Sequence, residues 1–333
     1  AVLDNNKFII KNLPRPILAE YGEGAIIKVE GCGLCGSDIV KLQQNLVPNG
    51  SILGHEVVGT IVEIKTNTSF DVGDKVVLGH HVPCFYCQYC LSESYSMCRK
   101  FKSTNIIPGG FSEYIYVSEE HLNNTVFNAN LTLTSVEASY TEPLACCIRA
   151  VKRAKIFDNS KNLIIGLGAI GILMGEAAKA FGYQVFGCDL IKDRVNLSYQ
   201  FGFDKSFLIE NEDVTLEKMK KTAPLGFDTI FLTAGTVSAI EFAVKAARDG
   251  AKIIVFSSIK NNGSFKNNDI YYRELTVLSS YSSSPIDLED AINLLEIGKV
   301  KVSGLSTVYP IENINDALND TISNKIMKAY IKI

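Results

Sequence analysis

The amino-acid sequence predicts an α/β protein in which an irregular, mostly antiparallel β domain precedes a doubly wound parallel sheet. Two observations lead to this fold class. Up to about residue 140 the chain contains short β-type runs separated by glycines. From about residue 145, strand patterns alternate with helical patterns, which is typical of a parallel sheet with helices on both faces. The 333 residues are enough for one large or two medium domains with a sizeable core.

The predicted strands of the first part are short and punctuated by glycine. They lie at residues 25–29, 57–64, 75–77 and 114–117. In the second part, a strand at 163–165 runs through a glycine turn into a helix at 169–181. A strand at 183–188 then precedes a helix that ends near residue 201.

The later elements continue the same alternation. Strands are expected at 227–232, 252–256 and 275–278, with a helix at 237–247. After Pro285 we expect an amphipathic helix at 288–297, then short strands and a final strand at 328–333. This final strand is isolated from the other strands of the parallel sheet, so we expect it to return to the first domain.

The composition excludes several classes of protein. With 47% apolar residues, 21% charged residues and 9 prolines, the chain is neither disordered nor fibrous. Its longest apolar stretch, residues 163–175, is interrupted by glycine and is shorter than the roughly 20 residues that span a bilayer. No basic segment followed by an apolar one opens the chain, so no secretion signal is expected. A net charge of −3 without long basic runs argues against binding to nucleic acid or anionic membranes.

Four of the nine cysteines fall in one short window with the spacing C-x2-C-x2-C-x7-C: Cys84, Cys87, Cys90 and Cys98. In a large chain this density indicates a metal or catalysis in a reducing compartment, because disulfide frameworks belong to small secreted domains. Four thiolates at about 2.3 Å from the ion would form a closed, structural zinc site. An iron–sulfur cluster is a rival, but the ferredoxin pattern closes with a gap of three residues and a proline. Buried structural thiols are a second alternative.

A second set of metal-ligating residue types is spread along the chain: Cys35, His55, Glu56 and Glu142. A catalytic zinc needs about three protein ligands and one open position. Pro143 is expected to hold the backbone of Glu142 extended and so to direct its side chain. His55 and Glu56 are neighbours, so in an extended segment only one of them is an easy ligand at a time. A structural histidine and a surface carboxylate are the alternatives.

A glycine motif follows the strand at 163–165. Gly166, Gly168 and Gly171 form the pattern G-x-G-x-x-G between a predicted strand and a predicted helix, which indicates a dinucleotide site. Asp189 ends the next strand, where a carboxylate would accept hydrogen bonds from the adenosine ribose and repel a 2′-phosphate. This favours NAD over NADP. A helix cap is the alternative role for Asp189.

In this order the motifs resemble the zinc-dependent medium-chain dehydrogenases, nearly from end to end. The matching segments are Gly-Leu-Cys35-Gly-Ser37-Asp38, Gly54-His55-Glu56-Val-Val-Gly59, Asp71-Val-Gly-Asp-Lys-Val, the four-cysteine loop, Glu142-Pro-Leu-Ala-Cys and Gly166-Leu-Gly-Ala-Ile-Gly171. The chain is most similar to the branch of the sorbitol (L-iditol 2-) and threonine dehydrogenases, where glutamate replaces a cysteine of alcohol dehydrogenases in Glu-Pro-Leu-Ala. The resemblance implies a GroES-like catalytic domain at 1–143 and 284–333, and a Rossmann NAD-binding domain at 144–283.

The resemblance also implies roles for the catalytic residues. Cys35, His55 and Glu142 would bind the catalytic zinc, with Glu56 as a direct, water-mediated or exchanging fourth ligand. Ser37 would bind the substrate oxygen and begin a proton relay, and Asp38 would orient His55. The alternative is that Ser37 caps a helix and Asp38 lies in its first turn.

The expected cofactor contacts lie in the second domain. They are Gly166, Gly168, Ala169, Ile170, Gly171, Asp189, Arg194, Thr233, Phe256, Ser257, Ser279 and Tyr281, of which the last four would approach the nicotinamide. Two residues depart from the family pattern. Val40 stands where many relatives have a relay histidine, and Phe85 replaces a glycine after the first loop cysteine.

These features predict an oxidoreductase that transfers hydride between a secondary alcohol, such as a polyol or sugar derivative, and NAD. The alternatives are a threonine dehydrogenase, a general alcohol dehydrogenase, and a zinc-stabilised nucleotide-binding protein without catalysis. We expect a cytoplasmic homodimer or homotetramer with a small-molecule substrate.

Four cysteines have no recognised ligand spacing and are expected in the core or near the site: Cys32, Cys146, Cys147 and Cys188. His80 and His81 have either a structural role or a place near the site, and His121 gives no signal.

Overall fold

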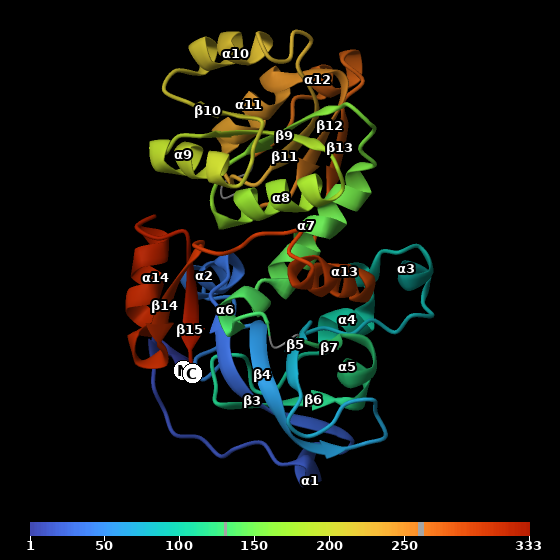
Figure 1. Cartoon of the computed structure of the whole chain (residues 1–333), viewed down its shortest axis with the longest axis vertical. Helices are drawn as coiled ribbons and strands as arrows, with labels where there is room; N and C mark the ends of the chain where they lie inside the picture. Colours follow the sequence, from blue (N-terminus) through green and yellow to red (C-terminus); the bar gives the residue numbers. More distant parts are fainter. Residues whose placement is uncertain (130–131, 259–262) are drawn as a thin grey trace. The chain divides into compact units, whose positions relative to one another are not determined.

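The computed structural model describes residues 1–129, 132–258 and 263–333 (Figure 1). The chain forms two compact units. Unit 1 consists of Ala1–Ala145 together with Ser283–Ile333, and unit 2 is Cys146–Ser282. Each unit has a large hydrophobic cluster of its own. Unit 1 is built mainly on antiparallel strands and unit 2 on parallel strands, which confirms the predicted α/β class.

Unit 1 contains a seven-stranded sheet in the order β14-β15-β3-β4-β5-β7, with β6 also paired to β3. The strands are β3 (Gly24–Gly33), β4 (Glu56–Lys65), β5 (Lys75–Leu78), β6 (Tyr114–Ser118), β7 (Val126–Asn128), β14 (Ser306–Pro310) and β15 (Lys328–Lys332). A separate ribbon pairs β1 (Val2–Asp4) with β2 (Lys7–Ile9). β3 is the central strand, because it pairs with β4, β6 and β15.

The last strand, β15, joins this sheet although every strand of the sheet except β14 is far from it in sequence. β15 pairs antiparallel with β3 and places Tyr330 opposite Gly33. The first four residues of β15 are buried, which explains why this segment is held by the core of unit 1.

The helices of unit 1 are short. They are α1 (Leu18–Tyr21), α2 (Gly36–Gln43), α3 (Gln88–Leu91), α4 (Arg99–Ser103), α5 (Glu119–Asn124), α6 (Ser135–Ala138), α13 (Pro285–Glu296) and α14 (Ile314–Ile322), with single 3-10 turns η1 (Tyr95–Met97) and η2 (Ile311–Asn313). α13 begins after Ser284, whose side chain caps the amide of Asp287, and Pro285 occupies the first turn, where no amide donor is needed.

Unit 2 contains a six-stranded parallel sheet in the order β10-β9-β8-β11-β12-β13. Its strands are β8 (Lys161–Ile165), β9 (Gln184–Asp189), β10 (Lys205–Leu208), β11 (Phe227–Leu232), β12 (Ala247–Val255) and β13 (Thr276–Ser279). The strand order reverses between β8 and β11. In open parallel sheets such a reversal leaves a crevice at the carboxyl ends of the two strands, where ligands bind.

The helices of unit 2 follow their strands in the predicted alternation. They are α8 (Ala169–Ala180), α9 (Lys192–Gln200), α10 (Glu212–Lys220), α11 (Val237–Ala246) and α12 (Asn267–Tyr272). α7 (Thr141–Ala154) begins in unit 1 and continues into unit 2. Among the described residues, no helix combines the length and the hydrophobicity that a membrane span requires.

The expectation of an extended backbone at Glu142 is wrong. Glu142 lies in the first turn of α7, one residue before Pro143. Proline is tolerated there because the first amides of a helix have no partner within the helix. The direction of the Glu142 side chain is therefore set by the start of a helix.

Candidate functional site

The four loop cysteines bring their sulfurs together in unit 1. The Sγ atoms of Cys84, Cys87, Cys90 and Cys98 lie within 4.8 Å of one another. Cys90 Sγ is 3.6 Å from Cys87 Sγ and 3.9 Å from Cys84 Sγ. A tetrahedral zinc at about 2.3 Å from each sulfur separates the sulfurs by about 3.8 Å. The four thiols therefore fit a closed zinc site.

Backbone amides stabilise negative charge on these sulfurs. The amide of Cys84 donates to Cys98 Sγ at 3.4 Å, and the amide of Cys87 donates to Cys84 Sγ at 3.4 Å. Desolvation alone would raise the pKa of Cys98, but amides including those of Phe101 and Cys84 lower this pKa to about 6. Desolvation and the neighbouring Cys87 raise the pKa of Cys90 to about 12. The cluster thus favours thiolates but needs a cation to ionise fully.

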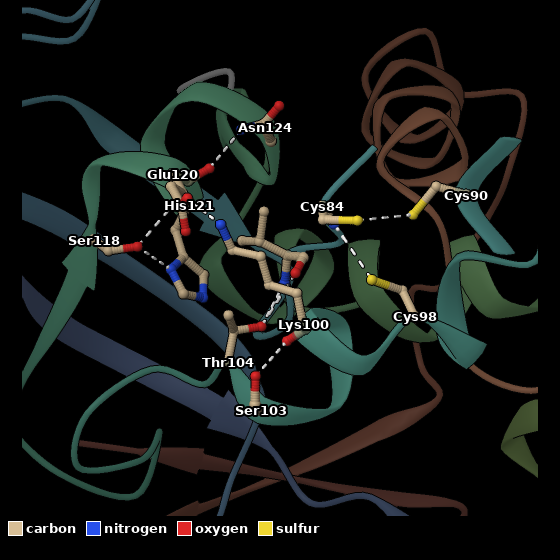
Figure 2. A network of polar contacts seen from close by, with 11 residues as sticks. Cys84, Cys90, Cys98, Lys100, Ser103, Thr104, Ser118, Glu120, His121 and Asn124 are labelled. Atoms are coloured by element: carbon tan, nitrogen blue, oxygen red, sulfur yellow. Dashed lines mark hydrogen bonds and ion pairs between the residues drawn. The ribbon is translucent and has the colours of Figure 1, made fainter. Parts of the chain in front are cut away.

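Short helices lie beside the cysteine loop in unit 1 (Figure 2). Cys84, Cys90 and Cys98 turn toward one another in this view, and α4 continues directly from Cys98. Lys100 of α4 forms an ion pair with Glu120 of α5. Phe85 adopts a φ of +66°, in the left-handed region that costs a non-glycine residue about 1–2 kcal/mol. The turn after Cys84 is therefore strained, while the sulfurs still meet.

A second group of ligand atoms lies in the same unit. Cys35, His55 and Glu56 each offer a donor atom, and the three atoms lie within 4.8 Å of one another. Cys35 precedes α2 as its N-cap, His55 immediately precedes β4, and Glu56 is the first residue of β4. A thiol, an imidazole and a carboxylate form a donor set that suits zinc with an open fourth position. The residues therefore fit a catalytic zinc.

Asp38 connects two of these ligands. Its Oδ2 accepts a hydrogen bond from the amide of Cys35 at 3.2 Å, and its Oδ1 lies 3.5 Å from His55 Nδ1. Burial alone would lower the pKa of His55, but the charges of Asp38 and Cys35 raise it well above its ordinary value. Because Asp38 lies beside Nδ1, Nε2 is the ring nitrogen of His55 that would serve a metal.

The sequence predicts that only one of His55 and Glu56 is an easy ligand if their segment is extended. That condition is not met, because His55 lies outside the strand, directly after Gly54, whose φ is +90°. Both residues offer a donor atom within 4.8 Å of that of Cys35. We also considered Ser37 as a helix cap, but the N-cap of α2 is Cys35, and Ser37 is an exposed residue of the first turn.

The predicted ligand Glu142 is buried, and within the described chain it is not a member of the Cys35 group. Of the four expected residues, the structure therefore brings together Cys35, His55 and Glu56.

Lys328 lies beside this group, although it is not among the residues predicted from the sequence. Its Nζ donates to Glu56 Oε1 at 2.9 Å and lies 2.6 Å from Glu56 Oε2. Burial alone would lower the pKa of Lys328, but the charges of Glu56 and Cys35 raise it above its ordinary value. The available signal was a lysine directly before the apolar run at residues 329–331 of the closing strand, since buried lysines are rare unless they are paired.

The chain has four histidines, and the other three each contact His80. The rings of His55 and His80 are 4.7 Å apart, and those of His80 and His81 are 4.0 Å apart. His121 Nε2 donates to the carbonyl of His80 at 3.1 Å. His80 thus lies beside a candidate metal ligand, whereas His81 interacts with the Thr104 carbonyl.

In unit 2, the glycine motif forms the turn between β8 and α8. Gly166 has a φ of +97°. A Cβ atom on Gly171 would lie 1.9 Å from the carbonyl oxygen of Gly166, so only glycine allows this approach of helix and turn. A Cβ on Gly168 would have Arg194 Nη1 at 3.9 Å as its nearest neighbour. Because this side of Gly168 is open, a ligand can approach the backbone of the glycine turn there.

Asp189 and Arg194 lie beside this turn. Asp189 Oδ2 accepts from the amide of Leu167 at 2.6 Å, and Oδ1 accepts from the amide of Ile191 at 2.8 Å. Arg194 Nη1 is 3.7 Å from Asp189 Oδ2. Asp189 is not the N-cap of α9, which is Ile191. A carboxylate and a guanidinium thus flank the glycine turn.

The other expected cofactor residues follow the carboxyl ends of parallel strands. Thr233 follows β11 and donates to the carbonyls of Ile165 at 2.9 Å and Gly166 at 2.7 Å. Phe256 and Ser257 follow β12, Ser279 ends β13, and Tyr281 is exposed two residues later. Ala169 and Ile170 begin α8. All of them lie at the ligand-binding edge of a parallel sheet.

Two known families match this chain. Residues 22–125 match the family "Alcohol dehydrogenase GroES-like domain". Residues 169–296 match the family "Zinc-binding dehydrogenase".

Individual proteins are similar over most of the chain. A sorbitol dehydrogenase of Bacillus subtilis is 31% identical over 77% of this chain and 73% of its own length. A sorbitol dehydrogenase of Halalkalibacterium halodurans is 28% identical over 97% of this chain and 95% of its own. The structure of alcohol dehydrogenase TADH from Thermus sp. ATN1 has the same fold, with a TM-score of 0.86, 20% identity and coverage of 99% and 98%.

Proposed function

Because the chain belongs to the zinc-binding alcohol dehydrogenase family, we propose that it interconverts a secondary alcohol and a ketone with NAD, and that the alcohol is a polyol or sugar derivative. The observation that carries this proposal is the group of Cys35, His55 and Glu56, which is separate from the four-cysteine loop. The sorbitol dehydrogenases among the relatives support the polyol class.

A zinc ion at Cys35, His55 and Glu56 would supply Lewis-acid activation of the substrate hydroxyl, and NAD would accept the hydride. Asp38 is proposed to prepare this chemistry, because its Oδ1 lies 3.5 Å from His55 Nδ1 and would favour the tautomer that leaves Nε2 for the metal. The Ser37 hydroxyl is exposed two residues after Cys35 and is proposed to accept the substrate proton. Because Val40 has no titratable group, we propose that Ser37 passes this proton directly to water.

The proposed cofactor site begins at the turn after β8. The backbone of the glycine motif and the amino end of α8 offer amides and a positive dipole to a pyrophosphate. Asp189 is proposed to accept hydrogen bonds from the adenosine ribose. Its carboxylate repels a 2′-phosphate, which supports NAD as the cofactor.

Replacing Asp189 with asparagine is expected to shift the cofactor preference toward NADP. The side chain keeps its shape and one acceptor, but the negative charge is lost, and Arg194 becomes available to a 2′-phosphate. Because hydrogen bonds to charged groups contribute about 1.5–3 kcal/mol, the ratio of kcat/KM for NADP to that for NAD should rise at least about tenfold. The measurement is steady-state kinetics with both cofactors. Adding Arg194→Met should cancel the gain, and an unchanged ratio in Asp189→Asn would contradict this role.

The proposed substrate class is tested by an NAD-linked screen over polyols, sugar phosphates, amino alcohols and simple alcohols. We expect turnover of sorbitol, xylitol or a related polyol, and none of threonine. Turnover of threonine alone would identify a threonine dehydrogenase. A protein that binds two zinc ions and NAD but oxidises none of these alcohols would refute the proposed activity.

We further propose that the protein acts in the cytoplasm as a homodimer or homotetramer. All nine cysteines are present as free thiols, and the proposed zinc sites need thiolates, which a reducing compartment preserves. Sedimentation analysis of the purified protein tests the oligomeric state, and a monomer would overturn it.

A further inference from the structure

Lys41 places a positive charge beside the Cys35 group. It lies on α2 one helical turn after Ser37 and Asp38, so its side chain is a neighbour of both. Burial alone would raise the pKa of Asp38, but the nearby His55 and, to a smaller extent, the charge of Lys41 lower it. Among residues 1–129, 132–258 and 263–333, no carboxylate forms an ion pair with the half-buried Lys41.

The charges of the proposed metal site balance without Lys41. A zinc ion would meet the Cys35 thiolate and the Glu56 carboxylate, and Lys328 Nζ lies 2.6 Å from Glu56 Oε2. Together with the buried carboxylate of Asp38, these negative charges are matched by the two charges of zinc and the one of Lys328. Lys41 is therefore a surplus cation, one turn along α2 from Ser37.

His80 offers a hydrogen-bond donor in the same region. Its half-buried ring has its centre 4.7 Å from that of His55, and in the part of the chain that the structure describes neither ring nitrogen forms a hydrogen bond. Its backbone is fixed, because His121 Nε2 donates to its carbonyl at 3.1 Å and the Gly79 amide donates to the carbonyl of Thr125 at 2.8 Å. An imidazole carries at least one N–H in either protonation state. The ring is thus a fixed donor that has no acceptor in the protein.

Lys41 and His80 lie close to each other although they are far apart in sequence. Burial lowers the pKa of His80 and of His81, and the positive charge of Lys41 lowers both further. Charge effects between side chains decay over about 10 Å, so the ammonium lies near the two rings. An ammonium and an imidazole N–H are donors that suit the oxygens of a phosphate or a carboxylate.

We infer that Lys41 and His80 form a subsite for an anionic group of the substrate, so that the enzyme acts on polyols that carry a phosphate or a carboxylate. The four residues from Ser37 to Lys41 correspond to about 6 Å along the helix, which a chain of a few carbon atoms can span. The reacting hydroxyl and the anionic group can therefore belong to one small molecule. The inference rests on the proposed function, because it needs an alcohol bound beside Cys35 and His55.

The test compares sorbitol, sorbitol 6-phosphate and gluconate as substrates with NAD. We expect a higher kcat/KM for at least one of the two anionic compounds than for sorbitol, mainly through a lower KM. A preference for the phosphate ester identifies phosphate as the recognised group, and a preference for gluconate identifies a carboxylate.

Lys41→Met should remove this preference. The ratio of kcat/KM for the preferred anionic compound to that for sorbitol should fall about 10- to 100-fold, because a hydrogen bond between charged groups is lost. Lys41→Arg keeps the charge and should retain most of the ratio. His80→Phe keeps an aromatic ring but removes the N–H, so it should lower the ratio as well. Lys65→Met is the matched control, because Lys65 is exposed at the opposite end of β4 from Glu56, and it should leave the ratio unchanged.

Binding is measured separately by calorimetry in the presence of NADH, which cannot accept a hydride from the alcohol. Lys41→Met should weaken binding of the anionic compound by a similar factor, whereas a lysine that only stabilises the end of α2 would not affect it. Equal kcat/KM values for all three compounds, or an unchanged ratio and affinity in Lys41→Met, would overturn the inference. Failure of the proposed function gives a different result, because the unmodified protein would then oxidise none of the three, and the calorimetric comparison would still decide whether the subsite binds an anion.

Discussion

Replacing His55 with alanine is expected to remove one of two zinc ions per chain and to abolish turnover. His55 offers a ligand atom within 4.8 Å of those of Cys35 and Glu56. Two protein ligands without the imidazole hold zinc poorly, and Lewis-acid activation of the alcohol contributes several kcal/mol to catalysis. The expected loss of kcat/KM is therefore about 10³-fold or more.

The measurements are metal analysis of the purified protein and steady-state kinetics with NAD. His121→Ala is the matched control for metal content. His121 belongs to the same histidine cluster but interacts with Ser118 and the backbone of His80, so this variant should keep two zinc ions. Full turnover in His55→Ala would refute the proposed catalytic site.

Replacing Cys98 with serine is expected to remove the other zinc ion and to destabilise the loop. Cys98 is buried, and its sulfur accepts the amide hydrogen of Cys84 in the closed four-thiol cluster. A ligand that binds only the folded state contributes about 4 kcal/mol when its free concentration is about 1,000 times its dissociation constant. We expect a loss of stability of this order at such a zinc concentration, with one zinc ion retained.

Thermal unfolding at fixed zinc concentration, together with metal analysis, measures this effect. Cys188→Ser is the control. Cys188 is buried in β9 of unit 2, whereas both ligand groups belong to unit 1. That variant should retain two zinc ions. An unchanged zinc content in Cys98→Ser would show that the loop does not bind the metal through four thiolates.

The features predicted correctly from the sequence depend on short separations along the chain. The spacings of Cys84, Cys87 and Cys90 leave two residues between ligands, so local backbone geometry alone brings their sulfurs together. The glycine turn is equally local, because Gly166 and Gly171 are five residues apart and meet within one strand–turn–helix unit.

The direction of individual side chains was harder to predict. At His55 and Glu56 the rule of alternating sides does not apply, because the strand begins only at Glu56 and Gly54 turns the chain before it. At Glu142 the following proline predicts an extended backbone, but Pro143 lies in the first turn of a helix. Both cases depend on where an element begins, which is the least certain part of a sequence-based assignment.

The sequence by itself determined the fold class, the four-thiol loop and the glycine turn, because local patterns and the spacing of nearby residues encode them. It also identified the donor types of the proposed second metal site, although these residues are spread along the chain. Only the tertiary structure decided which donors meet at that site and which charged side chain lies beside them. Lys328 and Glu56 are 272 residues apart. Their contact depends on the register of β15 and β4 on either side of β3, and on the missing side chain of Gly33. Strand register is set by the packing of the whole sheet, so no local pattern predicts this pair.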